Sequence, residues 1–83
     1  MLDITIFTPA NIIFQGQAKS VILPGEMGVF EILPFHKRMM SRLITGNIDV
    51  DGRMFPVFRG IMKVEKNHVV AVVEQARAKG DQP

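Results

Sequence analysis

The chain has 83 residues and contains no cysteine, tryptophan or tyrosine. Without cysteine there is no disulfide framework, no thiolate metal site and no cysteine nucleophile. No apolar run approaches the ~18 residues that a membrane-spanning helix needs. The opening Met1-Leu2-Asp3 lacks the basic and apolar segments of a secretory signal. We therefore expect one small globular domain, for which a hydrophobic content of 47% supplies an adequate core.

Net charge is also low, at +2, but the charges are unevenly distributed along the chain. Residues 1–34 carry one cation against three acids, a net charge of −2, whereas residues 35–83 carry nine cations against five acids, a net charge of +4. This asymmetry is compatible with a solvated surface and with a surface that binds a partner.

Short segments in which apolar and polar residues alternate have the period of β-strands. We expect strands at residues 2–7, 12–17, 18–23, 29–33, 48–50, 53–58, 61–65 and 68–74, separated by turn residues. Asp51-Gly52 predicts a type I′ hairpin, and Pro56 places the second arm at a sheet edge or a bulge. The apolar run Val69–Val73 predicts a strand covered on both faces. The fold class is all-β, a flattened sandwich or barrel of about eight to ten short, mostly antiparallel strands.

Two segments need closer attention. Residues 24–28, Pro-Gly-Glu-Met-Gly, predict a type II turn, because Pro24 presets φ at the second position and Gly25 accepts a positive φ at the third. Residues 37–44 have apolar spacing that also fits a short helix, although the neighbouring segments are strand-like. Beyond a domain of residues 1–76, the polar composition of residues 77–83 predicts a frayed tail.

No residue set has the pattern of a catalytic or metal site. Residues 47–52 begin like a calcium loop, but Phe58 stands at the position where that loop needs glutamate. His36 and His68 lack the spacing of a zinc site. No glycine-rich turn precedes a helix, so no phosphate cradle is expected. We therefore expect neither an enzyme nor a cofactor, a metal or a small-molecule substrate.

One alternative function uses Lys37, Arg38 and Arg42 together with Phe30 and Phe35. Cations beside stacking aromatics are typical of small β-barrels that bind single-stranded nucleic acid. Against this alternative, the six phenylalanines lie within apolar runs or beside proline, where we expect them to serve the core.

An ordered motif set resembles the N-terminal domain of the epsilon subunit of F-type ATP synthases. The central motif is Val21-x-Leu23-Pro24-Gly25-x-x-Gly28-x-Phe30-x-Ile32-Leu33-Pro34-x-His36. Flanking matches are Thr8-Pro9, Phe14-x-Gly16, Leu43, Gly46, Phe58-x-Gly60-x-x-x-Val64 and Asn67-x-Val69. The resemblance covers residues 2–76, implies a ten-stranded β-sandwich, and makes residues 37–44 a strand.

The resemblance implies a non-catalytic rotor subunit of the central stalk. Such a subunit binds the gamma subunit and the c-ring, and it couples proton-driven rotation to ATP synthesis. It is peripheral to the cytoplasmic face of a bacterial inner membrane through the complex, and it binds no nucleic acid. Many members continue into two C-terminal helices that inhibit ATP hydrolysis. Since the sequence ends at Pro83, we expect neither those helices nor an ATP site.

Site residues follow from the resemblance position by position. The c-ring would face Glu26, Met27, Gly28 and Val29. The gamma subunit would face Thr8, His36, Lys37, Arg38 and Met40. The structural turns would depend on Pro24, Gly25, Pro34, Asp51, Gly52 and Gly60. The chain departs from the family pattern at Val29, where an acid is common, and at Phe35, where a glycine precedes the histidine.

Overall fold

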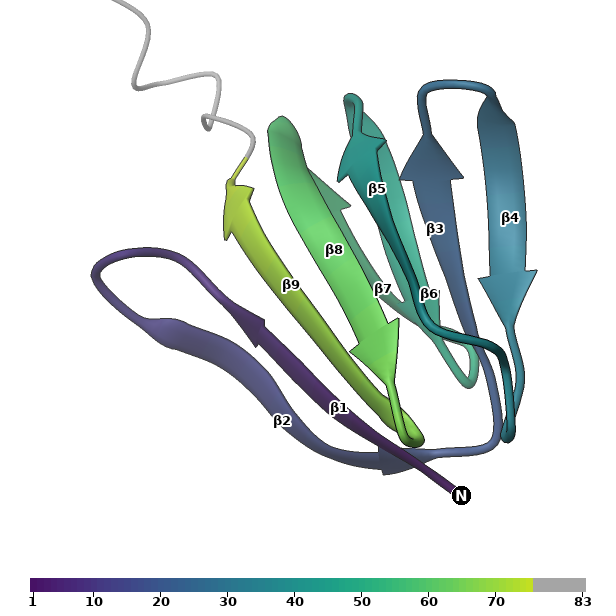
Figure 1. Cartoon of the computed structure of the whole chain (residues 1–83). Helices are drawn as coiled ribbons and strands as arrows, with labels where there is room; N and C mark the ends of the chain where they lie inside the picture. The colour runs from purple at the N-terminus through teal and green to yellow at the C-terminus, as the bar shows by residue number, and fades with distance from the viewer. Residues whose placement is uncertain (76–83) are drawn as a thin grey trace, which may run out of the picture.

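The computed structural model describes residues 1–75, which form nine β-strands and no helix (Figure 1). The strands are β1 (Leu2–Phe7), β2 (Ile12–Ala18), β3 (Val21–Gly25), β4 (Gly28–Ile32), β5 (Met39–Leu43), β6 (Gly46–Val50), β7 (Arg53–Val57), β8 (Arg59–Glu65) and β9 (His68–Glu74). The all-β class is confirmed, and the ambiguous residues 37–44 contain a strand, β5. No helix in this range is long and apolar enough to cross a membrane. The tail expected over residues 77–83 lies outside the described residues.

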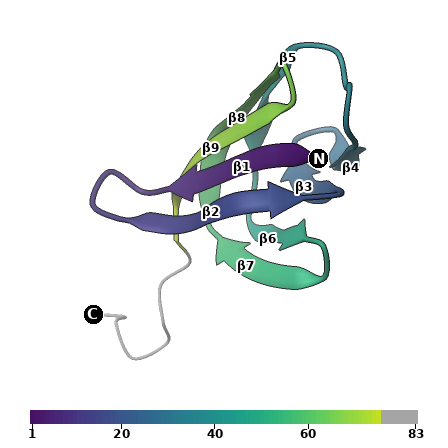
Figure 2. The same cartoon turned by 90° about the horizontal axis from the view of Figure 1, so that it is seen from below.

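The strands form one curled sheet with the hydrogen-bonded order β2-β1-β9-β8-β5-β3-β6-β7, and β4 pairs with β3. Every pairing is antiparallel except that of β1 with β9. Around β3 the ladders are short, because β5 pairs with β3 only at Gly25 and Leu43. The sheet bends there, so that β6 and β7 form a second layer facing the layer of β1, β2 and β9 (Figure 2).

Inward-facing side chains of both layers form one apolar core. It consists of Leu2, Ile4, Ile6, Ala18, Val21, Leu23, Ile32, Leu43, Ile48, Val50, Val57, Met62, Val64, Val69, Ala71 and Val73. Within residues 1–75, no buried side chain is polar or charged. Because successive side chains of a strand point to opposite faces, the alternating sequence of β1 places every second residue in this core. Burial of each large aliphatic side chain contributes about 1.5–3 kcal/mol.

Strand β9 differs from the expectation that both of its faces are covered. Val69, Ala71 and Val73 are buried, but Val72 on the opposite face is 40% exposed and Val70 is half-buried. That face lies on the outside of the curled sheet, where no described element covers it (Figure 1). The continuous apolar run therefore marks one buried face and one exposed apolar face.

The connection between β3 and β4 also differs from the prediction. Pro24 and Gly25 lie within β3, and Gly25 does not have a positive φ, so the predicted type II turn is wrong. The chain reverses at Glu26 and Met27, and Gly28 follows with φ 124°. Glycine is needed at Gly28 because a side chain would be strained in this conformation.

The hairpin between β6 and β7 is confirmed as a type I′ turn, since Asp51 and Gly52 have φ values of 48° and 92°. The Asp51 carboxylate accepts hydrogen bonds from the backbone N–H groups of Lys19 and Ser20, at 2.9 and 3.0 Å. These bonds fix the turn to the β2–β3 connection. Strand β7 lies at the end of the strand order, as Pro56 predicted.

Gly60 allows the close packing of β8 against β9. A Cβ at this position would collide with the Val72 carbonyl oxygen and would lie 2.8 Å from Val73 Cγ1. We expect Gly60→Ala to lower the free energy of unfolding by about 2 kcal/mol or more, because the ladder must separate to accept the methyl group. Urea denaturation followed by circular dichroism measures this change.

The matched control is Gly52→Ala, where a Cβ would meet nothing within 4 Å but where φ is 92°. Backbone strain alone should then cost about 1 kcal/mol. Equal losses for the two variants would contradict the proposed role of close packing at Gly60.

Candidate functional site

The four residues expected to face the c-ring come together at the β3–β4 hairpin, at the upper end of Figure 1. Met27 is fully exposed and Val29 is 74% exposed, beside the exposed carboxylate of Glu26. The two strands of this hairpin pair from Val21–Ile32 to Gly25–Gly28, so the tip stands on a regular ladder. An exposed apolar tip beside a carboxylate is suited to contact with another protein.

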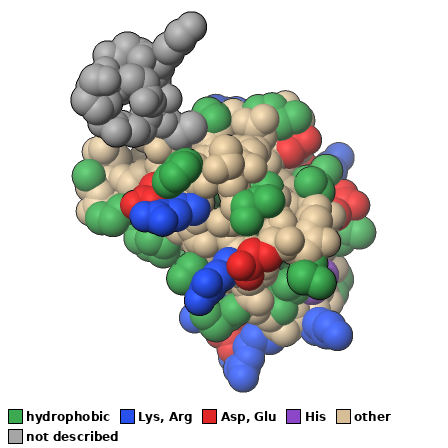
Figure 3. Space-filling model, turned by 90° about the horizontal axis from the view of Figure 1, so that it is seen from above, with side chains coloured by type: hydrophobic (Ala, Val, Ile, Leu, Met, Phe, Trp, Pro, Cys, Tyr) green, Lys and Arg blue, Asp and Glu red, His purple; other side chains and the backbone are tan. Residues whose placement is uncertain are grey.

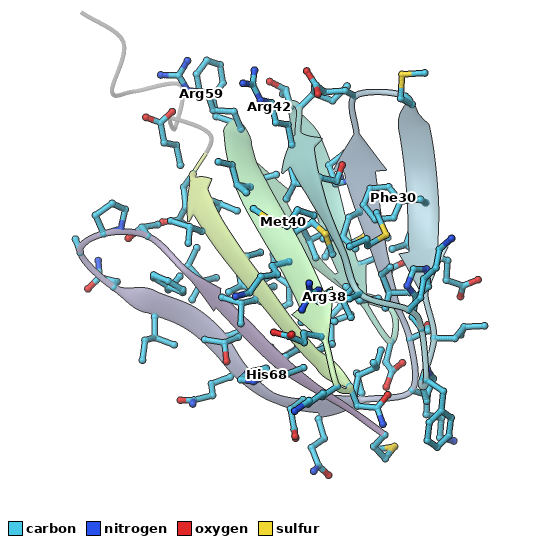
Figure 4. The ribbon with its side chains drawn as sticks, viewed as in Figure 1. Phe30, Arg38, Met40, Arg42, Arg59 and His68 are labelled. Carbon is cyan, nitrogen blue, oxygen red and sulfur yellow. The ribbon has the colours of Figure 1, made fainter. Side chains whose placement is uncertain are left out.

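A second surface is the outer face of β5, β8 and β9, where the lowest cross-strand row is polar and each of the two rows above it holds two apolar side chains and one cation. The row at the lower end holds Arg38, Glu65 and His68; the middle row holds Met40, Lys63 and Val70; the upper row holds Arg42, Ile61 and Val72. Figure 4 shows Arg38, Met40 and Arg42 one above another along this face. The side chain of Met40 is 66% exposed.

An ion pair fixes the lower row. Arg38 Nη1 donates a hydrogen bond to Glu65 Oε2 at 3.0 Å. This bond holds the pKa of the Glu65 carboxyl below its ordinary value of 4.5, and Lys63 and Lys66 act weakly in the same direction. Both partners are solvent-exposed, so the pair orients the side chains more than it stabilises the fold.

At the upper end of this face a groove of about 830 Å³ opens beside β5, β8 and β9. Its lining includes Ile44, Phe58, Ile61 and Val72, with Arg59 and Glu74 among the charged residues. Seen from above, apolar side chains lie among cations and acids on this end of the molecule (Figure 3).

Arg59 and Glu74 connect β8 to β9 across this end of the molecule. The two side chains form a hydrogen-bonded ion pair, which raises the pKa of Arg59 above its ordinary value. The Arg59 guanidinium also lies 5.4 Å from the ring centroid of Phe58, a cation–π geometry. The pair therefore holds one side of the groove in a defined conformation.

The loop between β4 and β5 forms the third exposed feature. His36 N–H donates to the Leu33 carbonyl oxygen at 3.2 Å, and Phe35 has φ 68°. With Pro34 at the second position, these features define a type II turn, which normally has glycine where this chain has phenylalanine. Phe35 is 88% exposed.

Each of the two histidine side chains has a hydrogen-bonding partner within the domain. His36 Nδ1 donates to the carbonyl oxygen of Lys37 at 2.7 Å, and His68 Nε2 lies 3.4 Å from Thr5 Oγ1. His36 lies in the β4–β5 loop, whereas His68 is the first residue of β9. Among residues 1–75 no group of three or more histidine, aspartate or glutamate side chains comes together in a way that could hold a metal ion.

Of the residues expected to face the gamma subunit, the structure brings together His36, Lys37, Arg38 and Met40, in β5 and the loop before it. Thr8 lies in the β1–β2 connection, and two strands, β9 and β8, separate β1 from β5 in the sheet. Its hydroxyl oxygen accepts hydrogen bonds from the N–H groups of residues 10 and 11. Thr8 thus shapes its own turn, apart from the other four residues.

Family membership follows from the sequence match. Residues 1–79 match the family model described as the ATP synthase delta/epsilon chain, beta-sandwich domain. The chain belongs to this family. The match includes all nine strands of this delta/epsilon-type domain.

Individual relatives agree with this assignment. The ATP synthase epsilon chain of Nitratiruptor sp. is 40% identical over 80 residues, which cover 90% of this chain and 62% of the relative. The ATP synthase epsilon chain of Campylobacter jejuni is 33% identical over 82 residues, which cover 99% of this chain and 55% of the relative. The delta/epsilon-type chain described here therefore spans about 55–62% of the length of these relatives.

Solved structures share the fold. A chain in a cryo-EM structure of the Euglena gracilis mitochondrial ATP synthase with its c-ring matches with a TM-score of 0.82 and 16% identity, over 99% of this chain and 56% of that chain. A chain in the central stalk/c-ring structure of the Tetrahymena thermophila mitochondrial ATP synthase matches with a TM-score of 0.74 and 15% identity, over 96% of this chain and 68% of that chain. At these identities the likeness establishes the β-sandwich fold.

The groove is not predicted from the sequence of this delta/epsilon-type domain, and the predicted burial of its phenylalanines is only partly correct. Phe14, Phe30 and Phe55 pack against the core as expected. Phe35 and Phe58, however, are 88% and 50% exposed, so the expectation that every phenylalanine serves the core is wrong. The apolar run of β9 is one signal of the groove, because a strand with two apolar faces in a curled sheet exposes one of them.

The ion pair between Arg38 and Glu65 predicts a pH-dependent stability. The folded-state pKa of Glu65 is lowered, so the contribution of the pair is present above pH 4.5 and is lost as the pH falls through the lower, folded-state value. We expect Arg38→Gln to lower the free energy of unfolding slightly at neutral pH, and this difference should vanish in acid. Urea titrations over a pH series measure it.

Arg42→Gln is the matched control, because Arg42 lies on the same face and forms no ion pair with any residue in the described range. Its effect should not change across the same pH interval. A pH-independent effect of Arg38→Gln would contradict the prediction.

Proposed function

We propose that this chain is a non-catalytic subunit of the ATP synthase central stalk. In this role it binds the gamma subunit on one side and the c-ring on another, and it couples proton-driven rotation of the ring to ATP synthesis. Membership of the delta/epsilon family carries the proposal. The bacterial relatives favour a location at the cytoplasmic face of an inner membrane, where the complex keeps the chain peripheral to the membrane.

The β3–β4 hairpin is the proposed contact with the c-ring. It projects from the upper end of the molecule (Figure 1). Met27 and Val29 offer exposed apolar surface, and the Glu26 carboxylate offers an acceptor for a donor or cation on the ring. Because neither Met27 nor Glu26 is buried in the isolated domain, contact with the ring would not disturb the core.

The proposed gamma-binding surface comprises His36, Lys37, Arg38 and Met40. It combines exposed apolar area at Met40 with cations at Lys37 and Arg38. The strand that carries Met40 pairs with β8 over five consecutive residue pairs, from Met39–Val64 to Leu43–Gly60. At Met40 the contact is mounted on this ladder, whereas His36, Lys37 and Arg38 lie in the loop before β5.

Transmission of torque requires a body that does not shear, and the fold supports this role. The single core is continuous through both layers, and protein interiors are packed as densely as organic crystals. The two proposed contacts lie in consecutive segments of the chain, joined by β4. The hairpin and the proposed gamma-binding surface are therefore connected through the β3–β4 ladder, the pair of Gly25 with Leu43 and the shared core.

The alternative function, binding of single-stranded nucleic acid, requires two exposed aromatic rings that lie together. Phe30 packs against the core, so it does not form a stacking platform together with Phe35. The two aromatics that this alternative requires are therefore not displayed together.

Charge reversal tests the gamma-binding surface. We expect Lys37→Glu and Arg38→Glu to weaken binding to a cognate gamma subunit by about threefold to tenfold each, with slower association, because exposed cations mainly steer encounter. Surface plasmon resonance with the whole chain measures both effects. Lys19→Glu is the charge-matched control, because Lys19 lies in the β2–β3 connection, outside β5 and the loop before it. Equal behaviour of all three variants would show that the two cations are merely solvated.

Substitutions of two exposed methionines, Met27 and Met54, test the c-ring contact. We expect Met27→Glu to leave thermal stability unchanged, because Met27 is fully exposed, but to reduce proton-coupled ATP synthesis in the reconstituted complex severalfold. The control is Met54→Glu, since Met54 is 58% exposed on the edge strand β7. Undiminished synthesis with Met27→Glu would argue against contact of this hairpin with the ring.

A further inference from the structure

Phe35 combines two unfavourable features in one residue. Its φ of 68° lies in the left-handed region, where a bulky side chain is a rare and strained occupant. Its ring is also 88% exposed, so burial within the described fold does not compensate the strain. A residue held in such a conformation persists only when its surroundings over-determine it, and such residues cluster at functional sites.

The surroundings of Phe35 do over-determine it. Asn67 Oδ1 accepts a hydrogen bond from Phe35 N–H at 2.6 Å, and the Asn67 carbonyl oxygen accepts one from Asp3 N–H at 2.8 Å. On the opposite side of the turn, His36 N–H donates to the Leu33 carbonyl oxygen at 3.2 Å. The backbone of Phe35 is thereby fixed to the β8–β9 turn and, through it, to the N-terminal strand.

Two exposed lysines flank this aromatic. Lys37 is two residues after Phe35, and Lys66 immediately precedes Asn67, whose side chain binds the Phe35 backbone. Neither lysine forms an ion pair with any described residue; the ion pairs found join Arg38 to Glu65 and Arg59 to Glu74. An aromatic ring on a fixed backbone is thus accompanied by one exposed cation in its own loop and one in the β8–β9 turn that holds it.

We propose that Phe35 is an anchor that inserts into an apolar pocket of the gamma subunit, and that carboxylates on the rim of this pocket face Lys37 and Lys66. The identity of the partner rests on the function proposed above. Large aromatic side chains dominate binding energy when they fill a desolvated pocket. Because the turn is already fixed, its backbone loses little freedom on binding, which favours affinity. Asn67 is a positioning residue that keeps the anchor in this conformation.

Replacement of Phe35 by glycine separates anchoring from a structural role. Phe35→Gly relieves the left-handed strain, so the melting temperature should rise by about 4 °C or more. The same change removes the ring, so the affinity for a cognate gamma subunit should fall by about 30-fold. Differential scanning fluorimetry and calorimetric titration of the full chain measure these opposite effects. The control is Met54→Ala, whose 58% exposed side chain lies on β7; its affinity should stay within about twofold of wild type.

Two further variants test the positioning and the rim. Asn67→Gly tolerates the φ of 61° at this position but removes the acceptor of the Phe35 N–H, so the affinity should fall by less than for Phe35→Gly. Lys66→Glu should slow association with the gamma subunit. The attraction contributed by Lys66 weakens as salt is added, whereas the repulsion contributed by a glutamate at this position would be relieved by salt. Unchanged association with Lys66→Glu would overturn the acidic rim.

The outcomes separate this inference from the proposed function. If the wild-type chain binds the gamma subunit and Phe35→Gly binds equally well, the anchor is overturned while the stalk function stands. If Phe35→Gly loses melting temperature and affinity together, the ring has a structural role and the anchor is again overturned. If the wild-type chain does not bind the gamma subunit, the proposed function itself falls, and the anchor falls with it.

Discussion

The parallel pairing of β1 with β9 is the interaction on which the rest of the fold depends. It runs from Asp3 opposite His68 to Phe7 opposite Val72, and it joins the first hairpin of the described chain to the last. An isolated two-stranded hairpin is marginally stable in water, so β1 and β2 need this ladder to remain folded. The same pairing makes one outer surface from β2 to β5, and it closes the core beneath that surface.

The two ends of the molecule are built differently. The non-glycine residues with positive φ in the described part of the chain are Phe35, Asp51, Lys66 and Asn67, and all lie in turns at the lower end of Figure 1. The side-chain oxygens of Asp51 and Asn67 accept hydrogen bonds from backbone N–H groups and so connect these turns to neighbouring segments. At the upper end, the β3–β4 tip relies on Gly28 and carries a fully exposed Met27. Side-chain hydrogen bonds thus hold the turns of the lower end, whereas the upper end combines the Arg59–Glu74 ion pair with a projecting hairpin.

Local chemistry explains why much of the fold was predictable from the sequence. Alternation located most strands, Asp51-Gly52 identified its hairpin, and Pro56 identified an edge strand, since each rule depends on a few adjacent residues. The resemblance to a known family resolved β5, where periodicity alone was ambiguous. The type II turn occurs at Pro34-Phe35 and not at Pro24-Gly25, because Gly25 still belongs to the β3 ladder.

Exposure was harder to predict than secondary structure, because it depends on the arrangement of layers. The apolar run of β9 has the composition of a strand buried on both faces, yet the curl of the sheet leaves Val72 on the outside. Phe35 could not be recognised as exposed because a proline-phenylalanine pair is compatible with core packing. Met27 is exposed because the chain reverses at Glu26 and Met27, between the paired residues Gly25 and Gly28.

The β1–β9 ladder also has a consequence for biosynthesis. The partners of β1 in β9 are separated from it by nearly the whole chain, so that ladder cannot form until residue 72 has left the ribosome. During translation the first hairpin therefore exposes an unpaired edge and the apolar face of Leu2, Ile4 and Ile6. Contacts of such long sequence separation slow folding, so this edge and this apolar face stay uncovered until β9 has been synthesised.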